Sequence, residues 1–218
     1  MKLSIKKYGA VEILIIINLI AFIPVLSAKY LGIDFFYTGL MNVFALGRVP
    51  GAPFFQFARW QLVTSMFIHG DIGHILLNMY GLYIFGKPFE TIIGKIQFTL
   101  YYLITGALAN LLSVLFFSIM QGQVVLIGAS GAVFAVVLGF AVFYPDSKLY
   151  MFFAIPMKIK TAIIIFTIIE IGSQLFFNSN VAHITHVLGF LFGFIYLIIV
   201  YRKNAVRILF FEKREYYH

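Results

Sequence analysis

Long apolar runs separated by short polar segments dominate this sequence. The runs are suited to membrane-spanning helices at six places, residues 11–27, 73–89, 97–120, 130–144, 161–177 and 181–201. The first run is close to the minimum of about 17 residues that a helical span needs. The pattern therefore predicts an all-α membrane protein, built as a bundle of six transmembrane helices.

The connections between these runs carry information of their own. Residues 28–72 contain charged residues and prolines but also many aromatic residues, which favour the membrane interface. We therefore expect a partly structured interfacial first loop. The fourth run is short, since its 15 residues reach only about 22 Å against about 30 Å of hydrocarbon. Residues 122–129 should dip into the membrane to meet it, which indicates a hydrated cavity.

The composition supports a membrane protein. Of the 218 residues, 62% are hydrophobic and 11% are charged, whereas soluble domains have about 45–50% and about 25%. We expect one domain over residues 1–218, with a basic tail at 202–218. The basic and apolar N-terminus lacks a small-residue cleavage site, so we interpret it as a retained span. The absence of cysteine excludes disulfides and thiolate chemistry.

The charge distribution predicts an orientation. The formal net charge is +8, but the basic residues stand in short clusters rather than in the patch that nucleic-acid binding requires, so we expect no nucleic-acid partner. Thirteen of the 16 basic residues fall on the side of the two termini, and the other three are Lys29, Arg48 and Arg59. The positive-inside rule then places both termini in the cytoplasm, at the cell membrane if the source is prokaryotic.

Ser130 is the first candidate for chemistry. It stands in Gly128-Ala129-Ser130-Gly131, at the outer start of the fourth predicted helix. The flanking glycines permit tight turns and close backbone approach. A serine at this position is also common as an ordinary helix N-cap, so the motif alone leaves a structural role open.

His186 is the second candidate, because an ionisable residue inside a span is costly and indicates a functional site. Gly189 and Gly193 follow on the same helix face, where another helix can approach closely. The fourth helix offers three small residues for that contact: Gly131, Ala135 and Gly139. Such packing would bring Ser130 within hydrogen-bond reach of His186, as a serine nucleophile requires. A packing stripe with a satisfied histidine is the structural alternative.

His74 and Asn78 share a face at the outer start of the second predicted helix. Two neutral donors directed at one point suit an oxyanion hole, although interhelical hydrogen bonds are an alternative. Four polar side chains thus fall near the outer ends of three spans. This common depth favours a single hydrolytic site.

A metal site is the competing chemistry, because four histidines fall on the outer side: His69, His74, His183 and His186. Metal hydrolysis usually needs a carboxylate or a third well-placed ligand, and Asp71 lies on a predicted loop. Neither His69-x4-His74 nor His183-x2-His186 has the His-x3-His spacing of a zinc-protease helix. We therefore predict neither a metal nor a cofactor.

Together and in order, these motifs resemble the rhomboid protease family. The matching residues are His69-x4-His74-x3-Asn78, Glu90, Gly128-x-Ser130-Gly131 with Ala135 and Gly139, and His186-x2-Gly189-x3-Gly193. The resemblance covers roughly residues 60–201. One departure lies in the first loop, where many members carry Trp-Arg and this chain has Trp60 followed by Gln61, with Arg59 before it.

The resemblance implies an intramembrane serine endopeptidase that cuts transmembrane segments of other membrane proteins, using a Ser–His dyad without a third acid. Ser130 would be the nucleophile and His186 the general base. His183 would be a neighbour, because only His186 has glycines three and seven residues later. His74, Asn78 and the backbone N–H of Ser130 would form the oxyanion hole. The implied partners are membrane-protein substrates and the lipid bilayer, and no oligomeric state is predicted.

Two other functions stay open. A rhomboid-like protein could bind membrane proteins without cutting them, and the presence of both Ser130 and His186 argues against that. A small transporter could use Glu170, in the fifth predicted span, together with the histidines. Glu170 has no role in the implied dyad. Cleavage that Ser130→Ala abolishes would exclude both alternatives.

Overall fold

The computed structural model describes residues 8–32, 34–48, 58–120, 124–151, 155–176 and 183–202. These residues form eight α-helices, one short 3-10 helix (η1) and two small antiparallel sheets. In chain order the elements are α1 (Ala10–Leu31), α2 (Asp34–Phe44), β1 (Leu46–Arg48), α3 (Gln61–Thr64), η1 (Ser65–Phe67), α4 (Ile72–Ile93), α5 (Lys95–Ile119), β2 (Val124–Leu126), α6 (Ser130–Phe143), β3 (Lys148–Met151), β4 (Ile155–Lys158), α7 (Ile159–Phe176) and α8 (His183–Tyr201).

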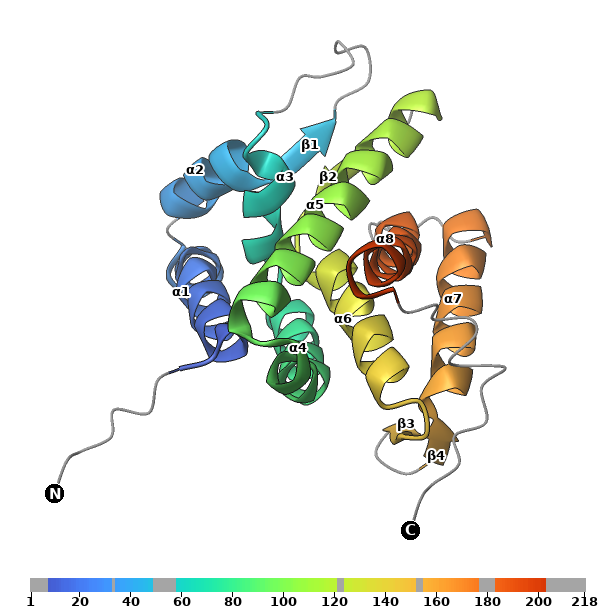
Figure 1. Cartoon of the computed structure of the whole chain (residues 1–218). Helices are drawn as coiled ribbons and strands as arrows, with labels where there is room; N and C mark the ends of the chain where they lie inside the picture. The colour runs from blue at the N-terminus through green and yellow to red at the C-terminus, as the bar shows by residue number, and fades with distance from the viewer. Residues whose placement is uncertain are drawn as a thin grey trace, which may run out of the picture.

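The predicted six-helix bundle is confirmed, and it consists of α1, α4, α5, α6, α7 and α8 (Figure 1). α6 lies at the centre and packs against α4, α5 and α8. Ten of its 14 residues are buried, as expected for a helix that is apolar on all sides. Around it the core is filled by large aromatic side chains that are fully buried, among them Phe89, Phe98 and Tyr101.

Four of the described helices are long and apolar enough to span a membrane: residues Ala10–Ala28 of α1, and the whole of α5, α7 and α8. α4 has 22 residues, but polar side chains such as Asn78 and Glu90 lower its hydropathy. α6 has 14 residues and reaches only about 21 Å at 1.5 Å per residue. Large apolar side chains such as Ile20 and Ile168 are exposed on the outer helices, which is favourable only against lipid.

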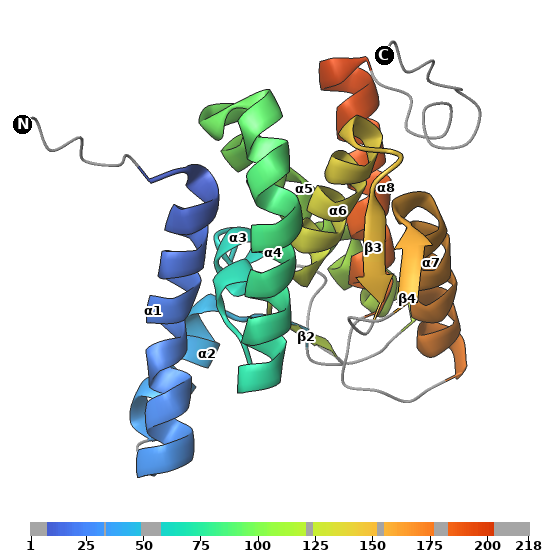
Figure 2. The same cartoon turned by 90° about the horizontal axis from the view of Figure 1, so that it is seen from below.

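The direction of the helices brings three helix starts together. Figure 2 shows that α1 begins and α8 ends at the same end of the bundle. Consecutive helices of the bundle alternate in direction, so α4, α6 and α8 all begin toward the opposite end. These are the helices on which the sequence places its candidate residues.

The loops contain two small sheets that the hydrophobic pattern did not predict. β1 pairs antiparallel with β2, aligning Leu46 with Leu126, and β3 pairs with β4. β1 belongs to the predicted interfacial segment 28–72 and β2 to the predicted dipping segment 122–129, of which residues 122 and 123 lie outside the described part. The first loop is therefore hydrogen-bonded to the segment that leads into Ser130.

Side chains around α3 anchor the first loop to the end of α2. The indole N–H of Trp60 and the amide of Gln61 both donate to the carbonyl of Val43, each at 3.2 Å. The hydroxyl of Thr64 donates to the carbonyl of Phe44 at 3.0 Å. The last carbonyls of a helix have no partner within it, so these bonds satisfy them. Gln61, where the rhomboid pattern has arginine, thus takes part in the anchoring.

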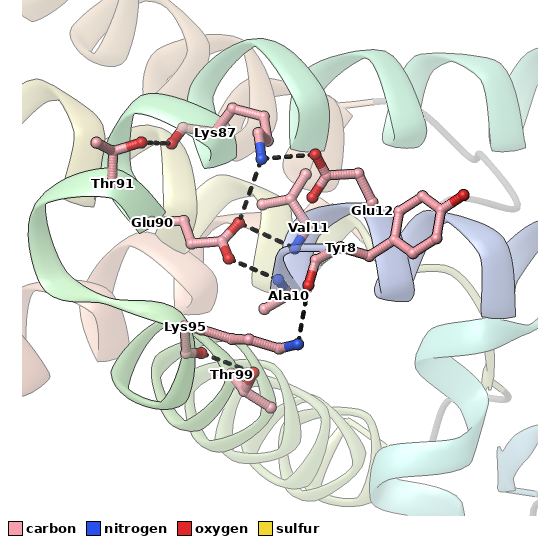
Figure 3. Close-up of polar contacts among 9 residues, drawn as sticks. All are labelled: Tyr8, Ala10, Val11, Glu12, Lys87, Glu90, Thr91, Lys95 and Thr99. Atoms are coloured by element: carbon pink, nitrogen blue, oxygen red, sulfur yellow. Dashed lines mark hydrogen bonds and ion pairs between the residues drawn. The ribbon is translucent and has the colours of Figure 1, made fainter. Parts of the chain in front are cut away.

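Glu90 ties the start of α1 to the end of α4 (Figure 3). Its carboxylate accepts the N–H of Ala10 at 2.6 Å and the N–H of Val11 at 3.2 Å. The first N–H groups of a helix lack internal partners, and a negative charge is favourable beside them. Lys87 lies 3.9 Å from Glu90 and 2.6 Å from Glu12. The buried carboxylate is therefore both hydrogen-bonded and paired.

Candidate active site

Small residues set the distance between α6 and α8. A Cβ added at Gly189 would overlap the carbonyl oxygen of Gly131, and one added at Gly193 would come within 3.2 Å of Ala135 Cβ. Side chains at these positions would hold the helices apart. The two backbones therefore touch along the predicted stripe, and the start of α6 lies against the start of α8.

Gly139 does not belong to that contact, so its predicted place against the sixth span is wrong. The ring of Phe89, on α4, fills the space that a Cβ at Gly139 would occupy. Phe89 is itself fully buried and stands edge-on to Tyr101, with the ring centroids 5.0 Å apart. Gly139 thus allows α4, rather than α8, to approach α6.

Ser130 and His186 meet where α6 and α8 begin. The Oγ atom of Ser130 lies 2.7 Å from Nε2 of His186. The N-cap position of α6 belongs to Ala129 and has no side-chain cap bond, so the Ser130 hydroxyl does not serve as a cap. Phe134, one turn along α6, stacks on the His186 ring with centroids 4.5 Å apart and planes 13° apart. The stacking fixes the plane of the imidazole beside the hydroxyl.

A cavity of about 690 Å³ lies at this point, and all four predicted site residues line it: Ser130, His186, His74 and Asn78. The amide of Asn78 donates to the carbonyl of His74 at 2.9 Å. Because that amide has two N–H donors, this bond uses only one of them. The cavity is large enough to hold several residues of a peptide together with water.

Gly128 lets the loop before α6 cross the ring of His74. It has φ of 107°, which lies in the region that favours glycine. A Cβ at Gly128 would also overlap Nε2 of His74. The N–H of Gly128 donates to the carbonyl of Ser65 at 2.9 Å, which fixes the turn. The first glycine of the serine motif therefore places His74 beside the loop that presents Ser130.

His69 supports the same turn from the loop before α4. It is fully buried, and its Nε2 accepts the N–H of Ala129 at 3.4 Å. Its ring meets the ring of His74 edge-on, with centroids 4.9 Å apart. Burial, and secondarily the proximity of His74, lowers the pKa of His69 to about 3. His69 is therefore neutral near pH 7, so that its Nε2 has a free lone pair to accept the N–H of Ala129.

Glu170 occupies an unexpected position. It projects from α7, and its Oε2 lies 2.9 Å from Nδ1 of His186 and 2.5 Å from Nδ1 of His183. The sequence offered one signal for it, an ionisable residue in an otherwise apolar span. The structure therefore brings a carboxylate to the ring nitrogen of His186 that faces away from Ser130.

In the described part of the chain, the side chains placed closely enough to hold a metal ion together are Glu170, His183 and His186. The donor atoms of Glu170, His183 and His186 all lie within 4.8 Å of one another, and two histidines with one glutamate are a ligand set that zinc uses. His69 and His74 do not belong to it. Because Nε2 of His186 faces Ser130, the arrangement can also transfer a proton between hydroxyl and imidazole beside a carboxylate.

Two further polar residues line the cavity and were not anticipated from the sequence: Asn110 and Thr185. Asn110 donates to the carbonyl of Leu62 at 2.9 Å and to the hydroxyl of Ser65 at 3.1 Å. Thr185 pairs with Ser113, with the two hydroxyl oxygens 2.7 Å apart. Polar side chains within apolar runs often form such bonds between membrane helices, and this is the sequence signal that could have identified the two residues.

Comparison with known proteins establishes the family. A family model described as "Rhomboid domain" matches residues 56–203. The chain belongs to the rhomboid family, and its apolar helices make it a multi-pass membrane protein.

Several curated proteins are similar to this chain. RHOMBOID-like protein 4 of Arabidopsis thaliana is 31% identical over 144 residues, which cover 64% of this chain and 34% of that protein. Putative rhomboid protease YdcA of Bacillus subtilis (strain 168) is 25% identical over 148 residues, covering 68% and 70%. Rhomboid protease GluP of the same organism is 30% identical over 157 residues, covering 72% and 29%. The alignments span 23% to 40% of the length of four of the plant relatives.

Proposed function

We propose that this chain is an intramembrane serine endopeptidase that cleaves transmembrane segments of other membrane proteins. The observation that carries the proposal is the 2.7 Å contact between Ser130 Oγ and His186 Nε2. A serine becomes a nucleophile when a neighbouring base can take its proton. Both residues line the cavity, which gives a substrate room to reach them. The membership of the chain in the rhomboid family also supports the proposed activity.

In the proposed reaction Ser130 attacks the carbonyl carbon of the scissile bond, while Nε2 of His186 takes the hydroxyl proton. A C–O bond forms, and the carbonyl electron pair moves to oxygen. The C–N bond then breaks as His186 returns its proton to the leaving amine, which leaves an acyl-enzyme. A water molecule, deprotonated by His186, attacks the ester, and the acid product departs as Ser130 recovers its proton.

The negative charge on the carbonyl oxygen needs hydrogen-bond donors. We assign this role to His74, to Asn78 and to the backbone N–H of Ser130. His74 and Asn78 line the same cavity as Ser130, and Asn78 has a second N–H beyond the one that it gives to the His74 carbonyl. In soluble proteases a donor of this kind lowers the barrier by about 3–4 kcal/mol.

The proposal includes an orientation with both termini in the cytoplasm. The start of α1 and the end of α8 lie at the same end of the bundle (Figure 2), which supports this orientation. The excess of basic residues on that side supports it as well. The chain has no cysteine, so single cysteines report sidedness without background. In right-side-out vesicles an impermeant maleimide should label Arg59→Cys and spare Lys95→Cys. The reverse pattern would contradict this orientation.

A serine-directed fluorophosphonate probe tests the activity class. The purified protein should be labelled, while Ser130→Ala and His186→Ala should not. Ser118→Ala is the matched control, because it removes a buried hydroxyl on α5 and should retain labelling. Thermal unfolding in detergent verifies that each variant is folded. Labelling of Ser130→Ala at the wild-type level would show that Ser130 is not the nucleophile.

A further inference from the structure

Glu170 and Ser130 approach opposite nitrogens of the same imidazole ring. Ser130 Oγ lies 2.7 Å from Nε2 of His186, and Glu170 Oε2 lies 2.9 Å from Nδ1. The three side chains come from α6, α8 and α7. The side chains of His186 and Glu170 are 13% and 14% exposed, so solvent screens this pair far less than it screens a surface ion pair.

The position of the carboxylate matters because a neutral imidazole carries its proton on only one nitrogen. Nε2 of His186 can accept the Ser130 proton only if Nδ1 holds the ring proton. A carboxylate beside Nδ1 stabilises that tautomer, and it stabilises the imidazolium that forms when Nε2 is protonated. Nδ1 of His186 is at ion-pair distance from Glu170 without an aligned hydrogen bond. Such contacts often become aligned only when substrate binds.

We propose that Glu170 is a positioning residue for His186, so that the site works as Ser130–His186–Glu170 rather than as the dyad implied by the family resemblance. This inference rests on the proposed function, because it concerns the same reaction. Glu170 takes up no proton in it. The carboxylate holds the Nδ1–H of His186 while Nε2 accepts the proton of Ser130 and passes it to the leaving amine.

His183 holds the carboxylate in place. Its Nδ1 lies 2.5 Å from the same Oε2 of Glu170, and its ring stands edge-on to His186, with centroids 6.1 Å apart. A carboxylate oxygen has two lone pairs, so it can accept both Nδ1–H groups. His183 therefore positions Glu170 from one side while Glu170 positions His186 on the other.

A purely structural role for Glu170 has to be separated from this one, because Glu170 also connects α7 to α8. Gln174, one turn further along α7, makes a similar connection through its Oε1, which accepts the backbone N–H of Ile184 at 3.0 Å. This bond reaches the backbone of α8 rather than an imidazole. Gln174→Ala is therefore a matched control that removes a tether between the two helices.

The experiment measures the rate constant of Ser130 labelling by the fluorophosphonate probe across the pH range in which histidine titrates. The titratable groups that face His186 are Glu170 from α7, His183 from α8 itself and His74 from α4. Wild type, Glu170→Gln, Glu170→Asp and Gln174→Ala are compared. The variant Ser130→Ala provides the unreactive baseline.

The proposal expects Glu170→Gln to react about 10- to 100-fold more slowly near neutral pH, as for loss of one hydrogen bond to a charged group. The acid limb of its profile should move to lower pH, because His186 loses the charge that stabilises its protonated form. Glu170→Asp should recover part of the rate. Gln174→Ala should keep the position of the acid limb.

Two results would overturn the proposal and leave the proposed function intact. One is a wild-type rate and acid limb in Glu170→Gln. The other is equal slowing of Glu170→Gln and Gln174→Ala with no movement of the acid limb, which would assign Glu170 to helix packing. A wild-type protein that does not react at all would contradict the proposed function, and the role of Glu170 would fall with it.

Nitrogen-15 NMR of the histidine-labelled wild-type protein tests the same point without depending on the folding of Glu170→Gln. The signals of His186 are assigned by their absence in His186→Gln. The proposal expects the proton of neutral His186 on Nδ1. A proton found on Nε2 would overturn the proposal and the proposed function together, because Nε2 would then be unable to accept the proton of Ser130, whereas the labelling profiles above separate the two.

Discussion

Gly189 on α8 packs directly on the backbone of Gly131 on α6, so that the carbonyl oxygen of Gly131 occupies the space of a Cβ at position 189. Gly131 directly follows Ser130, and Gly189 lies three residues after His186. The separation of Ser130 from His186 is therefore governed by the size of the residue at position 189.

Gly189→Ala should separate α6 from α8 and impair the site. Overpacking of a tight contact costs about 1–3 kcal/mol of stability, and a misplacement of about 1 Å can slow a reaction about 100-fold. Probe labelling and thermal unfolding measure the two effects. Gly172→Ala, on α7, is the control, because a Cβ there meets nothing within 4 Å. A wild-type labelling rate in Gly189→Ala would show that this contact does not set the geometry.

Asn78→Ala should lower the turnover number about 100- to 1,000-fold if its amide stabilises the oxyanion. The Michaelis constant should change little, because the bond strengthens in the transition state. Asn18→Ala is the matched control for Asn78→Ala. Asn18 donates to the carbonyl of Leu14 at 2.8 Å, the same local bond that Asn78 makes, but it lies on α1. Equal losses in both variants would reassign Asn78 to helix stability.

Glu90→Gln should destabilise the bundle by about 1.5–3 kcal/mol, because it removes a charged acceptor from the start of α1. The labelling rate of each folded molecule should be unchanged. Glu12→Gln is the comparison, since Glu12 pairs with the same Lys87 but is partly exposed, and exposed pairs contribute about 0–1 kcal/mol. The midpoint of unfolding is the measurement. A larger loss for Glu12→Gln than for Glu90→Gln would refute this account of the helix start.

His69 should make the protein less stable in acid. Its pKa is about 3 in the folded protein against 6.5 for a free imidazole, so protons bind the unfolded chain more readily. The contribution of neutral His69 is complete above pH 6.5 and is lost as the pH falls toward 3, by at most about 1.4 kcal/mol per pH unit. His69→Gln should show a shallower acid dependence of the unfolding midpoint. An unchanged slope would mean that other groups control it.

The six spans could be predicted because long apolar runs leave little choice to a chain in lipid. The predicted fifth span, 161–177, matches α7 within two residues at each end. The meeting of Ser130 and His186 was expected because glycines mark where helices touch. Gly139 was misplaced because α6 is apolar on every side, so its sequence does not reveal which face meets which neighbour.

Glu170 shows the same limit. Seven of the 18 residues of α7 are isoleucine and they lie on several faces of the helix, so the sequence does not fix the rotation of that helix about its axis. Only this rotation turns Glu170 toward His186. The pairing of β1 with β2 could not be predicted for another reason. Each strand has three residues, which is too few to show an alternating pattern. The two strands are also far apart in the sequence, because the long helices α4 and α5 lie between them.

Cleavage of a reporter in a defined bilayer tests the central claim most directly. The purified chain is reconstituted into liposomes with a tagged transmembrane segment, and the products are identified by mass spectrometry. The wild-type protein should cut the segment once or a few times near its outer end, while Ser130→Ala and His186→Ala should leave it intact. Cleavage by Ser130→Ala at the wild-type rate would contradict the account.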